Sequence, residues 1–283
     1  MLDFFLFNEP NIVVVALGVS LIGFFSGFTG VFLVLDKKSL LGDAISHSLL
    51  PGICVAFLFH QSKSPWILLV GATISGLLST VFIDLISERT KLSRDTALAI
   101  SLSLFFSLGI LLLTYIQHHM PANQAGLEFY LFGKAAAINE QELYLISIVG
   151  SIGTLALIAV YPQLKIMLFS QSFARSTGMN VTFLRALLNL VTVLTISIGI
   201  QAVGVVLMAS LILAPASISR LYSNSLSKIL FLSALIGASS GLLGTAISYS
   251  SIGMPTGPWI VLVLFTVSLM SLLFSKLKSK SHA

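Results

Sequence analysis

The sequence predicts an all-α polytopic membrane protein, and three of its features support that fold class. Of the 283 residues, 56% are hydrophobic and only 9% are charged, which is too apolar for a water-soluble domain of this length. Uncharged runs of about 20 residues, the length that spans roughly 30 Å of hydrocarbon, fill most of the chain. Lysines and arginines are concentrated between these runs, as expected of loops on one side of a membrane.

The first part of the chain predicts five transmembrane helices. These apolar runs occupy residues 12–35, 44–60, 65–86, 95–116 and 142–161. All but the second are long enough to cross a bilayer alone. The second run needs residues from its flanks to complete the crossing.

The rest of the chain predicts about four more spans. Residues 186–219 carry no charge and are too long for one span, and Gln201 with Gly204 marks a break between two helices, the second a candidate re-entrant segment. Residues 229–275 are also uncharged, but "SSIGMPTGP" marks a turn within them. We therefore expect about nine transmembrane helices, with eight as the alternative.

The positions of Lys and Arg predict an N-terminus outside the cell and a cytoplasmic C-terminus. If the spans alternate, only Lys63 and Lys134 face outward. The cytoplasmic segments then hold Lys37, Lys38, Arg89, Lys91, Arg94, Lys165, Arg175, Arg185, Arg220, Lys228, Lys276, Lys278 and Lys280. The net charge of +5 thus reflects topology and contacts with anionic lipid in the membrane, so no nucleic-acid partner is expected.

Two glycine clusters are typical of close helix packing rather than of nucleotide binding. Gly23 and Gly27 form a GxxxG pair, and Gly237, Gly241 and Gly244 repeat the pattern of small residues. Neither cluster ends in the GK[ST] of a P-loop, so the chain is not expected to bind ATP by that motif. GxSxG and HExxH motifs are missing as well, which disfavours an intramembrane hydrolase, and we expect no enzymatic activity.

The second span begins with "GDAISHSLLPG", which places Asp43 and His47 on one helix face. One carboxylate and one imidazole suit Zn, Mn or Fe(II), and a second copy of the helix would complete the coordination. Pro51 is expected to kink the helix and to free the carbonyl of His47. The alternative is structural: Asp43 caps the helix and His47 bonds a neighbour.

The motif "GDAISHSLLPGICVAF" resembles the signature of the integral-membrane permeases of ABC importers for zinc, manganese and iron(II). The similarity continues in order through "GLEFYLFGKAAAI", "SQSFARSTGMNVTFLR", "VGVVLMASLILAPASISRL" and "GLLGTAISYSSIGMPTGPWIVLV" and covers nearly the whole chain. It implies the ABC importer permease fold, one transmembrane permease domain over residues 1–283, and a bacterial plasma or inner membrane. It also implies that Asp43 and His47 are the transient metal site.

The resemblance further implies the partners and the cargo. A cytoplasmic ABC ATPase subunit hydrolyses ATP, an extracytoplasmic metal-binding protein delivers the ion, and a second permease chain, identical or related, completes the pathway. No permanently bound cofactor is implied, only a transported Mn²⁺, Zn²⁺ or Fe²⁺. The segment "QAGLEFYLFGKAA" is closer to the manganese and iron branch than to the zinc branch.

Residues 165–185 form the longest predicted cytoplasmic loop, and "SFARSTGM" within it resembles the coupling helix that docks on the ATPase. The residues so implicated are Ser170, Gln171, Phe173, Ala174, Arg175 and Gly178. Family members commonly have acidic residues just before this Phe-Ala, whereas Gln171 and Ser172 stand here, which argues against docking by charge pairs. The alternative for this segment is an ordinary solvated loop.

On the predicted outer side, His118 and His119 are a candidate pair for loading the metal, although adjacent histidines in a polar loop are often plain surface residues. Two other transport functions stay open. Asp and His in membranes also relay protons, which allows a proton-coupled metal carrier. An ABC permease for a siderophore or vitamin would share the architecture, but the compact Asp-x3-His pair disfavours it.

Overall fold

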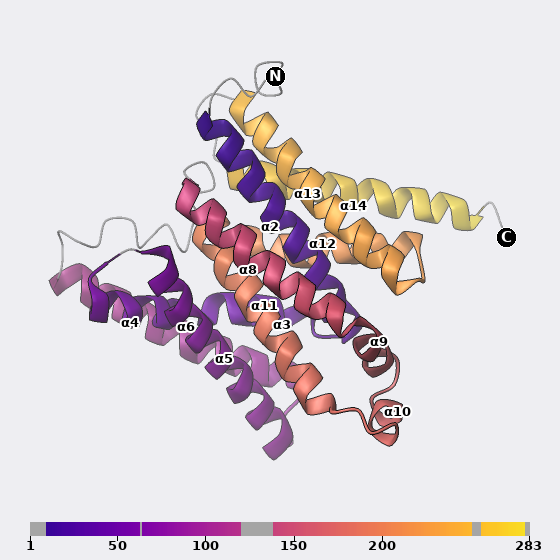
Figure 1. Cartoon of the computed structure of the whole chain (residues 1–283), viewed down its shortest axis with the longest axis horizontal. Helices are drawn as coiled ribbons and strands as arrows, with labels where there is room; N and C mark the ends of the chain where they lie inside the picture. Colours follow the sequence, from indigo (N-terminus) through magenta and orange to yellow (C-terminus); the bar gives the residue numbers. More distant parts are fainter. Residues whose placement is uncertain (1–9, 63, 120–137, 251–255, 281–283) are drawn as a thin grey trace.

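A computed structural model describes residues 10–62, 64–119, 138–250 and 256–280 of the chain (Figure 1). These residues form helices joined by short connections, and no strand occurs among them. The helices are α2 (Pro10–Leu35), α3 (Ser39–Ser48), α4 (Leu50–His60), α5 (Pro65–Arg89), α6 (Arg94–His119), α8 (Glu140–Ala159), α9 (Tyr161–Phe169), α10 (Gln171–Ser176), α11 (Val181–Val203), α12 (Val205–Tyr222), α13 (Leu226–Ser250) and α14 (Thr256–Lys280).

Within this part of the chain, eight helical stretches are long and apolar enough to cross a membrane. One of them, Ser39–His60, consists of α3 and α4 together. A shorter apolar stretch, Leu207–Tyr222 in α12, accounts for the difference between eight and nine predicted spans. The predicted all-α, multi-pass membrane fold is confirmed.

Helices α2 and α13 lie side by side along the middle of the bundle (Figure 1). A Cβ atom added to Gly23 would lie well under 3.0 Å from the carbonyl oxygen of Gly237, and one added to Gly237 would meet the carbonyl of Gly23 in the same way. A Cβ atom added to Gly27 would likewise lie 2.5 Å from the carbonyl oxygen of Ser233. The GxxxG spacing thus serves close backbone packing, as the sequence predicts.

The predicted break between two spans lies at Gly204, the single residue between α11 and α12. Its φ of 84° falls in the left-handed region, where a glycine has no side chain to clash. The two helices share α2 as a neighbour but otherwise pack mainly on different helices. Helix α11 packs on α8, α2 and α5, whereas α12 packs on α2, α14 and α13.

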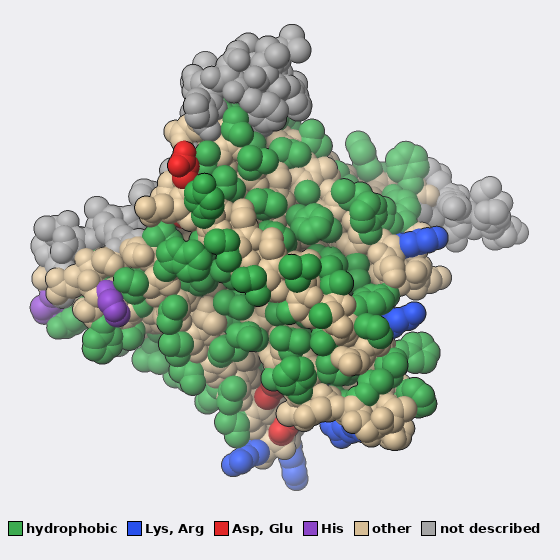
Figure 2. Space-filling model, in the orientation of Figure 1, with side chains coloured by type: hydrophobic (Ala, Val, Ile, Leu, Met, Phe, Trp, Pro, Cys, Tyr) green, Lys and Arg blue, Asp and Glu red, His purple; other side chains and the backbone are tan. Residues whose placement is uncertain are grey.

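Basic side chains gather at one end of the molecule, along the lower and right-hand border of the view in Figure 2. Helix α5 ends at Arg89 and α6 begins at Arg94. Arg175 lies in the last turn of α10, and Arg185 and Lys228 lie near the starts of α11 and α13. The histidines visible in the same view lie at the left border. The predicted orientation, with the basic end in the cytoplasm, requires this one-sided distribution.

Candidate metal-binding site

Asp43 and His47 lie inside α3, a short helix that packs against α6, α12, α11 and α5. The helix begins at Ser39, and its N-cap position is Lys38, which makes no capping side-chain bond. Asp43 is therefore an interior residue of the helix, and its alternative role as an N-cap is wrong. The sequence placed the start of this span too late.

The Asp43 and His47 side chains approach each other across one helical turn. The Oδ1 atom of Asp43 is 3.7 Å from Nε2 of His47, and the two side chains are 47% and 28% exposed. The His47 ring meets the Phe106 ring of α6 in a T-shaped arrangement, with 5.1 Å between centroids. Nδ1 of His47 is buried and has no hydrogen-bond partner among the described residues. Nε2 is thus the nitrogen available to an ion held beside Asp43.

The described part of one chain brings no more than these two metal-binding side chains, Asp43 and His47, to this place. Among the described residues, no three His, Cys, Asp or Glu side chains lie close enough together to hold a metal ion. Oxygen and nitrogen donors in this ratio suit Mn, Fe(II) or Zn. Further His, Cys, Asp or Glu ligands have to come from outside the described part of this chain.

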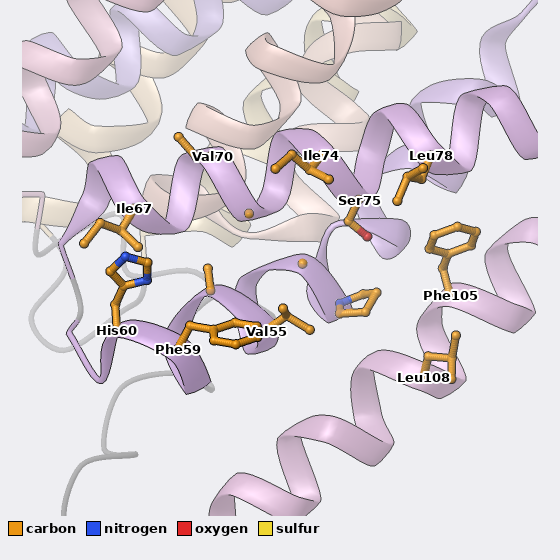
Figure 3. A pocket seen from close by; sticks show the side chains of 14 residues that line it. Val55, Phe59, His60, Ile67, Val70, Ile74, Ser75, Leu78, Phe105 and Leu108 are labelled. Atoms are coloured by element: carbon orange, nitrogen blue, oxygen red, sulfur yellow. The ribbon is translucent and has the colours of Figure 1, made fainter.

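The face of α3 that carries the pair continues along α4 as an exposed apolar stripe, with Leu40 before the pair and Val55 and Phe59 after it. Beside α4 lies an apolar groove of about 600 Å³ between α4, α5 and α6 (Figure 3). Val55 and Phe59 reach into it from α4, and Phe105 and Leu108 from α6. An ionisable pair facing hydrocarbon is costly, so this face requires a covering of protein or water in the membrane.

The helix break that follows the pair lies at Leu49, between the end of α3 and the start of α4. Pro51 occupies the first turn of α4, where a missing N–H costs least. The sequence predicted a freed carbonyl at His47. In the structure it is the carbonyl of Ser48 that accepts a side-chain hydrogen bond, at 2.6 Å from the hydroxyl of Ser75 on α5.

The two histidines of the predicted loading pair form the exposed end of α6. The His119 ring stacks on Tyr115, with 4.2 Å between centroids, and its Nδ1 lies 3.0 Å from the Tyr115 carbonyl oxygen. No third metal-binding side chain joins His118 and His119 within the described residues. A loading role for them stays a prediction.

The predicted coupling segment folds into two short helices, α9 and α10, before α11 begins. Ser170 is the N-cap of α10 and accepts a hydrogen bond from the backbone N–H of Phe173. Ala174 is buried, and Gly178, just after α10, has a φ of 78°. Gln171 accepts a hydrogen bond of 2.5 Å from Arg185, so it supports the fold from within the segment.

The exposed part of this segment is aromatic. Phe173 is 58% exposed and Arg175 is also exposed, while Phe169 at the end of α9 is 95% exposed. Both phenylalanines line a cavity of about 700 Å³ between α9, α10 and the turn that joins α12 to α13. Sequence reasoning missed Phe169, because a phenylalanine in an apolar chain carries no local signal that it stays exposed.

Comparison with known proteins places the chain in a family. The model of the ABC 3 transport family matches residues 8–275. The chain belongs to the ABC 3 transport family. The family assignment made from the sequence is thereby confirmed.

Relatives in this family carry names that refer to metal transport. The chain is 40% identical to the manganese transport system membrane protein MntC of Bacillus subtilis, over 94% of this chain and 61% of that one. It is 38% identical to the zinc transport system membrane protein TroC of Treponema pallidum, over 95% of this chain and 90% of that one. The chain thus spans less than two thirds of the Bacillus protein but most of the Treponema protein.

A solved structure shares the fold of this ABC 3 family chain. PsaBC from Streptococcus pneumoniae in complex with Fab superposes with a TM-score of 0.84 at 31% sequence identity, over 95% of this chain and 94% of that one. The predicted permease fold is therefore confirmed.

Proposed function

We propose that this chain is the membrane-spanning permease subunit of an ATP-driven ABC importer for a divalent transition-metal ion, Mn²⁺, Zn²⁺ or Fe²⁺. The observation that carries the proposal is the Asp43–His47 pair, one carboxylate and one imidazole 3.7 Å apart on a helix inside the bundle. Family membership and relatives named for manganese and zinc transport support it. In this proposal, residues 1–283 act as one permease domain.

A second permease chain, identical or related, covers the exposed face of α3 and α4. Two chains that meet there bring two carboxylates and two imidazoles to one ion, which completes a four-donor set from a site that is incomplete in each chain. The same contact removes Asp43 and the exposed apolar stripe from lipid. The translocation pathway then runs along the interface between the chains.

The site holds the ion only transiently. Histidines in tight metal sites almost always donate their second ring N–H to an acceptor, and this raises their basicity. Nδ1 of His47 has no such acceptor among the described residues, and the ring packs edge-on against Phe106. Weak ligands suit a pathway from which the ion must also leave.

Two partner proteins complete the importer. ATP is hydrolysed on a separate cytoplasmic ABC ATPase subunit, which docks on α10 and on the exposed Phe169 and Phe173. The contact is mainly apolar, because Gln171 replaces an acidic residue and already bonds Arg185. An extracytoplasmic metal-binding protein delivers the ion on the opposite side, where His118 and His119 assist in loading.

The proposal is tested by reconstituting the chain in vesicles with its ATPase and its metal-binding protein, and by measuring uptake of labelled Mn²⁺ and Zn²⁺. We expect accumulation that requires ATP and all three components. Uptake by the isolated chain, driven by a pH gradient without nucleotide, would show a proton-coupled carrier instead. Uptake restricted to a metal–chelate complex would show a permease for organic ligands.

Docking of the ATPase is expected to depend on the two exposed phenylalanines. The double variant Phe169→Ala and Phe173→Ala should weaken binding of the ATPase to the permease by about tenfold or more, since buried aromatic anchors dominate interfaces. Phe231→Ala on α13 is the matched control, because Phe231 is 64% exposed but lies outside α9 and α10. Titrations of the ATPase against the permease in nanodiscs measure the affinity of the double variant and of the control. An equal loss of affinity in both would contradict this docking surface.

A further inference from the structure

Four buried serines meet beside the metal-binding pair. Ser48 ends α3, Ser75 and Ser79 lie on α5, and Ser101 lies on α6. They come from three different helices, and sequence patterns alone do not connect them. Their meeting point is the break between α3 and α4 at Leu49, two residues after His47.

The hydroxyls of Ser48, Ser79 and Ser101 form one chain of hydrogen bonds, and the Ser75 hydroxyl joins it through the Ser48 carbonyl. Ser79 donates to the Ser48 hydroxyl at 2.9 Å, and Ser48 donates to the Ala44 carbonyl at 2.7 Å. Ser79 and Ser101 are 2.9 Å apart, and because Ser79 has used its only hydrogen, Ser101 is the donor of that bond. Ser75 donates separately to the Ser48 carbonyl at 2.6 Å.

This network ends on the turn of α3 that carries the metal ligands. The bond from Ser48 to Ala44 spans the same helical turn as the pair Asp43 and His47, shifted by one residue. A helix that breaks inside a membrane leaves backbone carbonyls without partners, which is costly because lipid offers no hydrogen-bond donor. Ser75 satisfies the Ser48 carbonyl at the break, and Ser79 ties the same residue to α5 and α6.

We propose that Ser48, Ser75, Ser79 and Ser101 are positioning residues for metal binding: they fix the α3–α4 break and so hold His47 at its distance from Asp43. None of them is a ligand. The inference rests on the proposed transport function, and it adds that ion affinity is set partly by hydroxyls on α5 and α6. Hydrogen-bonded chains in a low-dielectric interior reinforce one another, so the loss of a central member loosens the whole network.

Three alanine variants of the complete importer separate positioning from plain stability. Ser79→Ala removes the central hydroxyl and both of its bonds, whereas Ser101→Ala removes one bond and leaves Ser79 joined to Ser48. Ser233→Ala is the matched control. Ser233 is equally buried and its hydroxyl also joins two helices, at 2.6 Å from the Gly27 carbonyl, but those helices are α13 and α2.

Two quantities are measured for each variant in assembled complexes: the Mn²⁺ concentration that gives half-maximal ATP-driven uptake, and equilibrium Mn²⁺ binding without ATP. We expect Ser79→Ala to raise both the half-saturating concentration and the dissociation constant about tenfold, the low end for loss of a supporting group behind a metal ligand. Ser101→Ala should give a smaller increase, and Ser233→Ala should leave both values at those of the wild type.

A purely structural role predicts another pattern. If Ser79→Ala and Ser101→Ala lower only the maximal rate, as Ser233→Ala would through stability, the proposal is overturned. If Ser79→Ala does not assemble, Ser101→Ala decides, and an unchanged half-saturating concentration overturns the proposal. Absence of ATP-driven uptake by the wild-type complex is a distinct result, because it removes the proposed function and this inference with it.

Discussion

Replacing Asp43 with asparagine or His47 with glutamine is expected to lower ATP-driven uptake of the metal ion at least about 100-fold. Both side chains face one point, with 3.7 Å between Oδ1 and Nε2. Asp43→Asn keeps the shape of the side chain but removes the charge that attracts a divalent cation, and His47→Gln removes the imidazole nitrogen. Since the loss of supporting groups alone costs 10–100-fold in metal sites, the loss of a ligand should cost at least as much.

The measurement is uptake of labelled Mn²⁺ and Zn²⁺ by vesicles that hold the assembled complex, with the amount of complex quantified for each variant. Asp95→Asn is the control, because it makes the same chemical change at an exposed residue in the first turn of α6. Wild-type uptake by both Asp43→Asn and His47→Gln would mean that the pair is structural, and the pathway would lie elsewhere in the chain.

The sequence predicts the transmembrane helices well because hydrophobic length is a local property. It fails at the start of α3, where Lys37 and Lys38 suggest a solvated loop and the span was placed from residue 44. In the structure α3 begins at Ser39, and Lys38 is buried with Asp36, with 2.5 Å between Nζ and Oδ2. Pairing lowers the cost of burying the two charges, so a charged turn lies inside the protein. The two charges are only two residues apart in the sequence, but the burial of their turn depends on tertiary packing.

The metal-binding pair shows the same division between local and long-range information. Helical periodicity is enough to place Asp43 and His47 on one face. The exposure of that face and the hydrogen bond from Ser75 to the Ser48 carbonyl depend on how α5 packs against the break. The spacing of Asp43 and His47 alone fits a structural role as well as a metal-binding one. The metal-binding interpretation came from the resemblance to a family.

Gly237→Ala is expected to destabilise the protein by about 2 kcal/mol or more, although alanine is the better helix former. The new Cβ would collide with the carbonyl oxygen of Gly23, and backbone of a long helix cannot move aside as a flexible side chain can. In lipid, helices are held together by close packing and not by exclusion of water, so separating α2 from α13 loses contacts along both helices.

The same substitution at Gly42 should have the opposite sign. A Cβ there would lie 3.8 Å from the Ile212 side chain, an ordinary contact, so Gly42→Ala removes a flexible helix residue without a clash and should stabilise by up to about 1 kcal/mol. Thermal unfolding of both variants in the same detergent gives the comparison. Because the chemical change is identical, a difference in sign isolates backbone proximity as the cause. Equal effects would contradict a tight α2–α13 contact, and the small residues of the two helices would then need another explanation.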